Sequence, residues 1–323
     1  MSDSLPSASI SVIVPTIGRP ESLARLLNSL AAQTCQVDEV LVADGSDGDE
    51  IARLIDQPRW STELNVRRLH VTPPNAVRQR KAAISEAVGD YLLLLDDDVE
   101  LEPDCVEQMF KLIESDASVA AVMADFNNQS WSRPTRAWRF YLRYILGLEE
   151  GAWQGRVVGP LLRFGFNPVP KSPQPIEWLG AGNSMIRRSA YNQAGGFSDF
   201  FLHRCTMNED VDLGLKLARI GKMYFCPKAR MAHYHSPSGR IHPALASEDD
   251  LFNRFLVLRI TKENSAVKSF CSIGVFFVIE TSSHFIGCIR RANFSQFGNH
   301  LNGRLAAIRR VILQREVRSF HDK

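Results

Sequence analysis

Short apolar segments alternate with amphipathic segments over the first 125 residues of the chain. The apolar segments have the length and the Val, Ile and Leu content of buried strands, and they cover residues 10–14, 37–42, 66–71, 91–95 and 119–123. The segments between them have the features of helices, and they cover a stretch that starts at Pro20 and residues 49–55, 75–88 and 103–115. This alternation predicts an α/β fold with a mostly parallel sheet and helices on both of its faces.

Acidic residues follow two of these predicted strands. Asp44 comes after the second strand, and Asp96–Asp98 come directly after the YLLLL segment at 91–95. Ligands of such sheets bind beyond the carboxyl ends of the strands. We therefore expect these acidic residues to share one crevice.

The pattern changes after residue 126. Residues 127–175 contain three tryptophans and several prolines, which predicts an insertion that covers the site, with a short helix near 138–146. The chain then returns to regular elements, for which we predict a strand at 178–186, helices at 189–194 and 210–220, and a strand at 223–226.

Residues 241–323 are predicted to form a helical, basic region. Residues 269–289 approach the length of a membrane span, but Glu280 and His284 lie inside them, so we favour a helical hairpin that packs on the preceding domain or lies in the membrane interface. Apolar residues recur at helical spacing farther on, among several arginines: Leu301, Leu305, Ile308 and Ile312 with Arg304, Arg309, Arg310, Arg315 and Arg318. This helix either lies on an anionic lipid surface or docks on the core with a solvated basic face.

The composition narrows the class of protein. With 323 residues, 45% of them hydrophobic and 23% charged, the chain is neither wholly disordered nor a multi-span membrane protein. The net charge of +2 is too small to indicate nucleic-acid binding, but residues 254–323 carry +8 and the rest −6, which suggests an anionic partner at the C-terminal end. The six cysteines lack metal-ligand spacing, and the first ten residues lack the features of a secretory signal. We therefore expect a cytoplasmic protein.

Three polar clusters could carry chemistry, and each also has a structural explanation. Asp96–Asp98 could hold a hard divalent cation or precede a helix as favourable negative charge. Asn208–Asp212 could supply a general base or simply complement a helix dipole. His233 and His235 point the same way if they lie on a strand, and either could reach a cation.

Taken together and in order, six segments resemble the family 2 (inverting) glycosyltransferases with the GT-A fold. They are ISVIVPTIGRPESL, VLVADGS, AVGDYLLLLDDDVELEPD, GAGNSMIRRSAYNQAGGF, NEDVDLGLKLARIGK and PKARMAHYH, and they extend from Ile10 to His235. The resemblance implies a Rossmann-like catalytic domain at 1–240, with a nucleotide-sugar half at 1–125 and an acceptor half at 126–240. Residues 241–323 lie beyond it.

The resemblance also implies roles for residues on the donor side. Pro15 and Thr16 correspond to the turn that contacts the nucleotide, and Asp44 corresponds to the carboxylate that binds the pyrimidine ring. Arg80 corresponds to an arginine near the base or the diphosphate, although Lys81 stands where the family has Asn, and Arg78 is an alternative.

Further roles concern the metal, the base and the acceptor. Asp96 and Asp98 match the Asp-x-Asp motif, with Asp96 near the ribose and Asp98 on the metal, where His233 completes the site. Asp210 matches the catalytic base of a Glu-Asp motif. Trp178 and the loop from Gly180 match the region that shapes the acceptor pocket. Asp97 and Glu209 lie inside these motifs and are expected to contact substrate.

The activity that follows is the metal-dependent, inverting transfer of a sugar from a UDP- or dTDP-sugar to a saccharide hydroxyl. The resemblance implies Mg²⁺ or Mn²⁺ as cofactor, a lipid-linked acceptor in bacterial surface polysaccharide synthesis, and a place at the inner face of the cell membrane. Two alternatives are a nucleotidyltransferase, against which the few glycines near the N-terminus argue, and a non-catalytic glycan-binding module. An oxidoreductase is disfavoured because no G-x-G-x-x-G follows the first strand.

Overall fold

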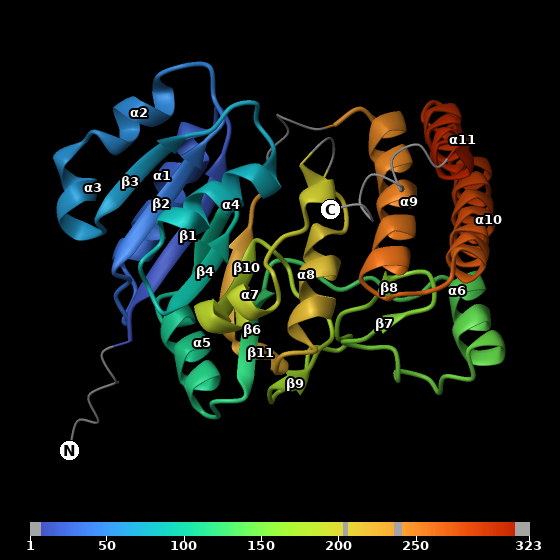
Figure 1. The fold of residues 1–323 in the computed structure, drawn as a ribbon, viewed down its shortest axis with the longest axis horizontal. Helices are drawn as coiled ribbons and strands as arrows, with labels where there is room; N and C mark the ends of the chain where they lie inside the picture. Colours follow the sequence, from blue (N-terminus) through green and yellow to red (C-terminus); the bar gives the residue numbers. More distant parts are fainter. Residues whose placement is uncertain (1–7, 203–205, 236–240, 314–323) are drawn as a thin grey trace.

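A sheet of nine strands forms the centre of the protein (Figure 1). The computed structural model describes residues 8–202, 206–235 and 241–313, and the counts below refer to these residues. The first four strands are parallel and lie in the order β3-β2-β1-β4: β1 (Ile10–Thr16), β2 (Glu39–Asp44), β3 (Val66–His70) and β4 (Tyr91–Leu95). β1, β2 and β4 are buried along their whole length, whereas β3 (VRRLH) is buried only at Val66, and all four lie close to the predicted strands.

The second half of the sheet is mixed. Its strands follow β4 in the order β10 (Asn183–Arg187), β6 (Val119–Phe126), β11 (Lys222–His233) and β5 (Val99–Leu101), and β9 (Gln174–Pro175) pairs with β11. Strand β10 is antiparallel to both β4 and β6, and its first residue, Asn183, lies opposite Leu95. The loop before β10 therefore meets the carboxyl end of β4, where the acidic cluster begins.

Helices cover both faces of the sheet, as predicted. One hydrophobic cluster joins the sheet to α1 (Pro20–Ala31), α2 (Glu50–Ile55), α3 (Pro58–Glu63) and α5 (Cys105–Glu114). A second cluster joins it to α4 (Ala76–Glu86), α7 (Arg188–Gln193) and α8 (Glu209–Leu217). Amphipathic helices on both faces keep the sheet buried, so its carboxyl edge is the place where polar groups gather.

The insertion at 127–175 contains more structure than its composition predicts. Helix α6 (Arg136–Phe140) continues into a π-helical turn, η1 (Tyr141–Ile145), near the expected position. Two short strands, β7 (Val157–Val158) and β8 (Leu162–Arg163), form a small hairpin, and a 3₁₀ turn, η2 (Asp199–Phe201), follows α7.

The strand predicted at 178–186 is wrong in its first half, because β10 begins only at Asn183. The preceding residues form a loop that other backbone approaches closely. A Cβ on Gly182 would overlap the Asp96 carboxylate, and a Cβ on Gly214 of α8 would lie 2.7 Å from the Trp178 Cα. These close contacts, rather than hydrogen bonds to a neighbouring strand, determine the path of residues 178–182.

The C-terminal region consists of three helices, α9 (Pro243–Ile260), α10 (Ala266–Arg291) and α11 (Phe297–Leu313). Side chains of α9 belong to the same hydrophobic cluster as α8, and α11 packs along α9. Helix α10 is long and apolar enough to cross a membrane by length and composition alone.

Of the two positions predicted for α11, docking on the core with a solvated basic face needs correction. Its inward residues include Gly303, Arg304 and Val311, whereas Leu305 and Ile312 of the predicted apolar stripe are exposed. Arg304 bonds to Thr281, and Arg310 pairs with Glu248 and Asp249, so these two cations face the protein. Arg315 and Arg318 lie outside the described residues. Helix α11 lies so close to α9 that a Cβ on Gly303 would overlap a backbone carbonyl. This close packing, rather than the spacing of the apolar residues, determines which side of α11 faces the protein.

Replacing Gly214 with alanine should destabilise the protein by about 1–3 kcal/mol, because the added methyl group meets the backbone at Trp178. An alanine at Gly274 of α10, where a Cβ meets nothing within 4 Å, should instead raise stability by up to about 1 kcal/mol. Urea denaturation of both variants measures the difference. Equal effects would show that the loop at Trp178 adapts to α8.

Candidate active site

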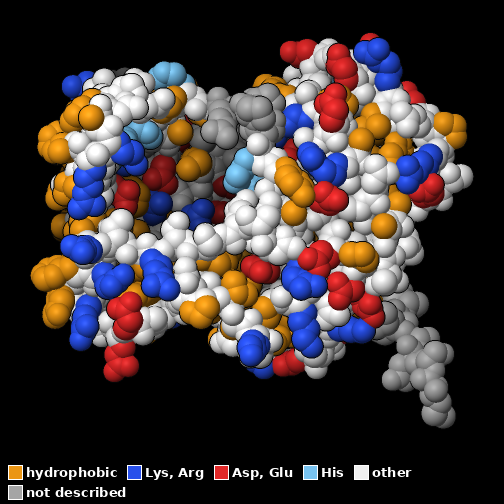
Figure 2. Space-filling view, turned by 180° about the vertical axis from the view of Figure 1, so that it is seen from behind, with side chains coloured by type: hydrophobic (Ala, Val, Ile, Leu, Met, Phe, Trp, Pro, Cys, Tyr) orange, Lys and Arg blue, Asp and Glu red, His pale blue; other side chains and the backbone are white. Residues whose placement is uncertain are grey.

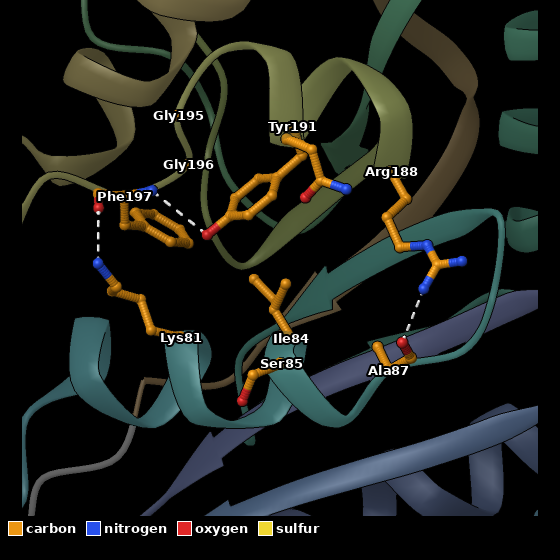
Figure 3. A pocket seen from close by; sticks show the side chains of 10 residues that line it. Lys81, Ile84, Ser85, Ala87, Arg188, Tyr191, Gly195, Gly196 and Phe197 are labelled. Atoms are coloured by element: carbon orange, nitrogen blue, oxygen red, sulfur yellow. Dashed lines mark hydrogen bonds between the residues drawn. The ribbon is translucent and has the colours of Figure 1, made fainter.

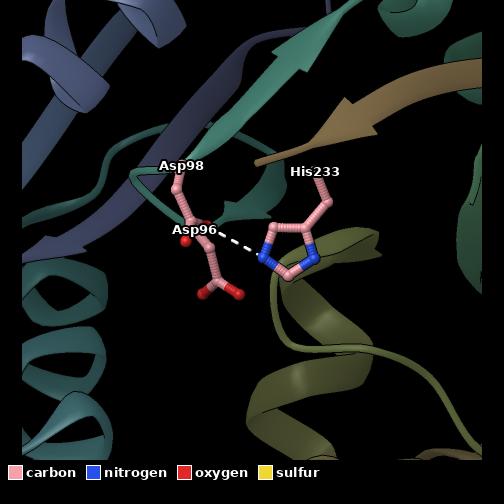
Figure 4. Close-up of side chains that lie close together, drawn as sticks. All are labelled: Asp96, Asp98 and His233. Atoms are coloured by element: carbon pink, nitrogen blue, oxygen red, sulfur yellow. Dashed lines mark ion pairs between the residues drawn. The ribbon is translucent and has the colours of Figure 1, made fainter. Parts of the chain in front are cut away.

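Asp96, Asp98 and His233 come together at the carboxyl end of β4 (Figure 4). Strand β4 ends at Leu95, and the chain turns through the three aspartates into β5, which pairs with β11 so that His233 lies opposite Val99. The Tyr234 amide donates to the Asp98 carbonyl at 2.8 Å and extends this pairing. The pairing of β5 with β11 therefore brings the histidine to the acidic turn.

These three side chains fit a divalent cation. One ligand atom from each lies within 4.8 Å of the others, and His233 Nε2 is 3.0 Å from Asp98 Oδ1. Two carboxylates and an imidazole form a donor set that suits Mn²⁺ or Mg²⁺. Burial would lower the pKa of His233, but the bond to Asp98 and the charges of the aspartates outweigh it and raise the pKa. The negative charge of the aspartates, which raises the pKa of His233, is the same charge that a bound cation would neutralise.

Asp97 lines the same cavity but bonds to groups at the end of β1 and just after it. Its carboxylate accepts from the Thr16 hydroxyl at 2.6 Å and from the Arg19 guanidinium at 3.1 Å, and Arg19 also lies 3.8 Å from Asp98. Burial raises the pKa of Asp97 to about 6, although these two partners act in the opposite direction. The geometry favours a structural part for Asp97, and the predicted substrate contact stays a prediction.

Arg80 of α4 connects the acidic turn to the start of α8. Its guanidinium lies 2.6 Å from Asp96 Oδ1 and 3.7 Å from Glu209 Oε1. The side chain is buried, and its Nε and Nη1 atoms have no hydrogen-bond partner among the described residues. Buried guanidinium donors without partners are rare, so they suit an anionic group that binds here.

The first turn of α8 presents two adjacent carboxylates, Glu209 and Asp210. Asn208 precedes them with a φ of 72°, and its amide bonds to Asp250 at 2.9 Å, which fixes the entry into the helix. Arg163 of β8 lies 3.4 Å from Asp210 Oδ2 and donates to Asn208 Oδ1. Burial, followed by the charge of Asp210, raises the pKa of Glu209. Asp210 is thus a partly buried carboxylate, 17% exposed, that pairs with Arg163 and accepts a hydrogen bond from the Val211 amide at 2.8 Å.

The predicted donor-side residues share one cavity of about 240 Å³, lined by Pro15, Thr16, Arg80, Asp96–Asp98 and His233. Figure 2 shows the hollowed face of the molecule, in which acidic and basic side chains lie at the floor of a depression. Glu209 lies 3.7 Å from Arg80, whereas Asp210 pairs with Arg163, and neither carboxylate lines this cavity. The fold thus brings Asp96, Asp98 and His233 together, and the role of Asp210 as the base stays a prediction.

Three other predicted residues lie outside this cavity lining. Both oxygens of Asp44 are engaged, one by Ser46 and the other by Arg68 at 2.8 Å, so its contact with a pyrimidine stays a prediction. Trp178 is buried, and Arg163 lies over its ring. Gly180 leaves room for the Asn183 side chain, which bonds to the Ala124 carbonyl.

Sequence reasoning missed three residues that shape the site: Arg19, Arg163 and Gly182. Arg19 belongs to the segment ISVIVPTIGRPESL, but no role was predicted for its side chain. Arg163 lies in the loop-rich insertion, where periodicity carries no signal. Gly182 was included only as part of a loop, although its missing side chain is what lets Asp96 approach β10.

Comparison with known proteins agrees with this geometry. The family model described as Glycosyl transferase family 2 matches residues 11–195. The N-acetylglucosaminyl-diphospho-decaprenol L-rhamnosyltransferase of Mycobacterium tuberculosis is 25% identical over 263 residues, which cover 76% of this chain and 80% of that protein.

Solved structures share the fold. GalNAc-T7, crystallised with UDP, GalNAc and Mn²⁺, matches with a TM-score of 0.58 and 16% identity over 80% of this chain and 48% of that one. Residues 1–349 of TarS from Staphylococcus aureus, in complex with UDP-GlcNAc, match with a TM-score of 0.55 and 14% identity over 91% and 79% of the chains. This chain spans 41% of a longer TarS chain. The likenesses confirm a GT-A-like α/β fold followed by C-terminal helices.

Proposed function

The chain belongs to glycosyl transferase family 2, and from this premise we propose that it is a metal-dependent, inverting enzyme that moves a sugar from a UDP- or dTDP-sugar to a saccharide hydroxyl. It is a glycosyltransferase (EC 2.4) that uses a nucleotide sugar. The observation that carries the proposal is the meeting of Asp96, Asp98 and His233 beside Arg80, which in turn lies 3.7 Å from Glu209 at the start of α8.

On the donor side, Asp98 and His233 would hold Mg²⁺ or Mn²⁺, with Asp96 beside them toward the ribose. When bound, the cation supplies positive charge that stabilises the departing diphosphate. Arg80 adds a buried cation to the lining of the same cavity, and its Nε donor has no hydrogen-bond partner within the part of the chain that the structure describes. Pro15 and Thr16 form the end of β1 at the mouth of this cavity and are placed to contact the nucleotide.

On the acceptor side, Asp210 would act as the base. It removes the proton from the acceptor hydroxyl as that oxygen attacks the anomeric carbon from the face opposite the diphosphate, which inverts the configuration. Arg163 holds the Asp210 carboxylate in position, and Glu209 is tied to Arg80 instead. One base is enough because no covalent intermediate forms. The GT-A domain at 1–240 would thus divide into donor and acceptor halves.

The acceptor proposed is a lipid-linked saccharide of bacterial surface glycan synthesis. The mycobacterial relative is named for an acceptor of that kind, and the apolar helix α10 with its basic ends supports contact with the inner face of a membrane. Of the two alternatives, a nucleotidyltransferase would release diphosphate, and a glycan-binding module would have no use for an assembled base and metal cluster.

The experiment is a screen of nucleotide sugars with Mn²⁺ or Mg²⁺, read as thermal stabilisation and as release of nucleoside diphosphate. We expect a UDP- or dTDP-sugar to stabilise the protein only with the cation present. Release of inorganic diphosphate from a nucleoside triphosphate would favour the nucleotidyltransferase. Absence of any stabilisation by nucleotide sugars would contradict the proposal.

A further inference from the structure

A second polar cavity, of about 470 Å³, lies between β8, α6, α9 and α10. Its walls combine aromatic and aliphatic side chains with arginines, among them Trp138, Met207 and Phe276 with Arg133 and Arg163. Arg254 also lines it, but that guanidinium is fixed by the carbonyls of Pro160 and Leu161 and by Asp250. An apolar wall with a few placed cations suits a ligand that is partly apolar and partly anionic.

This cavity adjoins the proposed base. Arg163 lines it and lies 3.4 Å from Asp210 Oδ2, and Asn208, which also lines it, precedes the first turn of α8. Asp210 itself does not line this cavity, but its partner Arg163 and its neighbour Asn208 do, and Asp96 and Asp98 line the other cavity. A ligand seated here would therefore lie next to the proposed base and in a separate cavity from the donor, as an acceptor requires.

Helix α10 forms the outer wall of the cavity with Phe276 and Glu280. Its inner face is tied to the protein, because Glu280 accepts from the Trp138 indole and Thr281 accepts from Arg304 at 3.0 Å. A helix that crossed a membrane would have to break these bonds and carry Glu280 into lipid. The inner contacts therefore favour a helix that lies along a membrane surface.

The outer face of α10 is apolar and uncovered. Four of its apolar side chains are more than 40% exposed: Val267, Val278, Phe285 and Ile289. Only 17% of the most apolar stretch of the helix is buried within the protein. Basic residues stand at its two ends, Lys268 near the start and the pair 290–291 at the end. The only acidic residue of the helix is Glu280, which is turned inward. Figure 2 shows hydrophobic and basic side chains side by side along the edge of the molecule formed by the C-terminal helices.

These features fit an anionic lipid surface. The basic residues at the ends of α10 can pair with acidic lipid head groups, and no carboxylate on this face would repel them. The apolar side chains between these ends can enter the acyl layer below the head groups. The adjoining α6–η1 segment has the same mixture of exposed apolar and basic residues as α10. Its exposed apolar residues are Phe140, Tyr144 and Ile145, and Arg139 and Arg143 lie among them. A helix is about 10 Å across, so a ligand in the cavity lies one helix width from whatever covers α10.

The cavity between α4 and α7 (Figure 3) has no comparable features. Its volume is about 500 Å³, but Lys81 is bonded to the Phe197 carbonyl and to Asp199, and Arg188 donates to the Ala87 carbonyl. Its cations are thus already used in joining the two helices.

We infer that the cavity bounded by β8, α6, α9 and α10 receives the phosphate-linked head of a lipid-anchored saccharide acceptor while the outer face of α10 lies on an anionic membrane. The inference rests on the proposed function, since it takes Asp210 as the base. Arg133, at the exposed side of the cavity, is the cation placed for the phosphate, and the apolar tail leaves past α10 toward the lipid.

The membrane part is tested by flotation of the full chain with phosphatidylcholine vesicles with or without phosphatidylglycerol. We expect binding that requires phosphatidylglycerol and that falls at least tenfold in the double variant V278S/I289S, because both exposed side chains lose their lipid contact. Val88→Ser, at an exposed position after α4, is the matched control and should bind as the wild type does. Binding by the double variant equal to that of the wild type would overturn this part.

The cavity part is tested with farnesyl diphosphate, which carries the anionic linker and an apolar tail, by calorimetry with UDP and Mn²⁺ present to fill the donor site. Met207→Trp should fill the mouth of the cavity and weaken farnesyl diphosphate binding at least tenfold, and Arg133→Ala should weaken it several-fold. Leu245→Trp, at an equally exposed position of α9, should leave it unchanged.

The affinity for UDP with Mn²⁺ separates the two hypotheses. It should be equal in all of these variants. If UDP binds but Met207→Trp leaves the affinity for farnesyl diphosphate unchanged, the cavity assignment is wrong while the proposed function stands. If UDP fails to bind the wild type, the proposed function itself fails.

Discussion

Replacing Asp98 with asparagine should lower the transfer rate by about 10³-fold or more and should abolish the dependence of nucleotide binding on Mn²⁺. The carboxylate is the partner of His233 at 3.0 Å and belongs to the group of three side chains whose ligand atoms lie within 4.8 Å. A cation that stabilises a departing diphosphate contributes several kcal/mol, and each 1.36 kcal/mol is a factor of ten in rate. Calorimetry of UDP with and without Mn²⁺, together with single-turnover rates, measures both effects.

Glu100→Gln is the matched control, because Glu100 lies two residues farther along, on β5, and does not belong to the group of three. It removes the same charge and should leave the Mn²⁺ dependence in place. A chelator should inactivate the wild type, and added Mn²⁺ or Mg²⁺ should restore it. An Asp98→Asn protein that keeps its response to Mn²⁺ would show that the cation binds elsewhere.

The donor half of this site could be predicted from the sequence because its residues follow from local pattern. YLLLL is long enough and apolar enough to be a buried strand, and parallel strands end at a common edge, so Asp96 and Asp98 had to lie at that edge. His233 did not follow in the same way. Its position depends on the pairing of β11 with β5, two segments far apart in the chain. The residues alone made His233 and His235 equal candidates, and only the family resemblance selected His233.

The acceptor half could not be predicted to the same degree. Arg163 lies on a two-residue strand in a segment without periodicity, and no local pattern indicates that it reaches Asp210. The segment before β10 has the composition of a strand, but Gly180 and Gly182 allow close approaches that a regular strand would prevent. In both places contacts between distant segments, rather than local preference, determine the structure.

The C-terminal helices show where apolar spacing misleads. The spacing of Leu301, Leu305, Ile308 and Ile312 is correct for a helix, yet α11 turns Arg304 and Val311 inward, because Gly303 permits a close approach to α9. Leu305 and Ile312 of α11 stay exposed, and the longer uncovered apolar face belongs to α10. A membrane-interface position for residues 269–289 could be predicted from their composition, but the side of α11 that faces the protein could not.

Replacing Asp210 with asparagine should lower the transfer rate by about 10²–10⁴-fold and leave the affinity for the nucleotide sugar within about twofold. The amide keeps the shape of the side chain and can still accept a bond from Arg163, but it cannot take a proton from the acceptor hydroxyl. The loss should therefore appear in the chemical step and not in donor binding. Single-turnover transfer and calorimetric binding of the donor, measured on the same preparation, separate these two quantities.

Asp199→Asn is the control for this experiment, because Asp199 is largely exposed, pairs with Lys81 at the surface and lies outside both cavities. It should transfer sugar at the rate of the wild type. Glu209→Gln distinguishes the two carboxylates of α8: since Glu209 faces Arg80 rather than Arg163, its loss should weaken donor binding more than it slows the chemical step. If Glu209→Gln abolished transfer and Asp210→Asn did not, the two residues would exchange roles, and the base would lie on the donor side of the site.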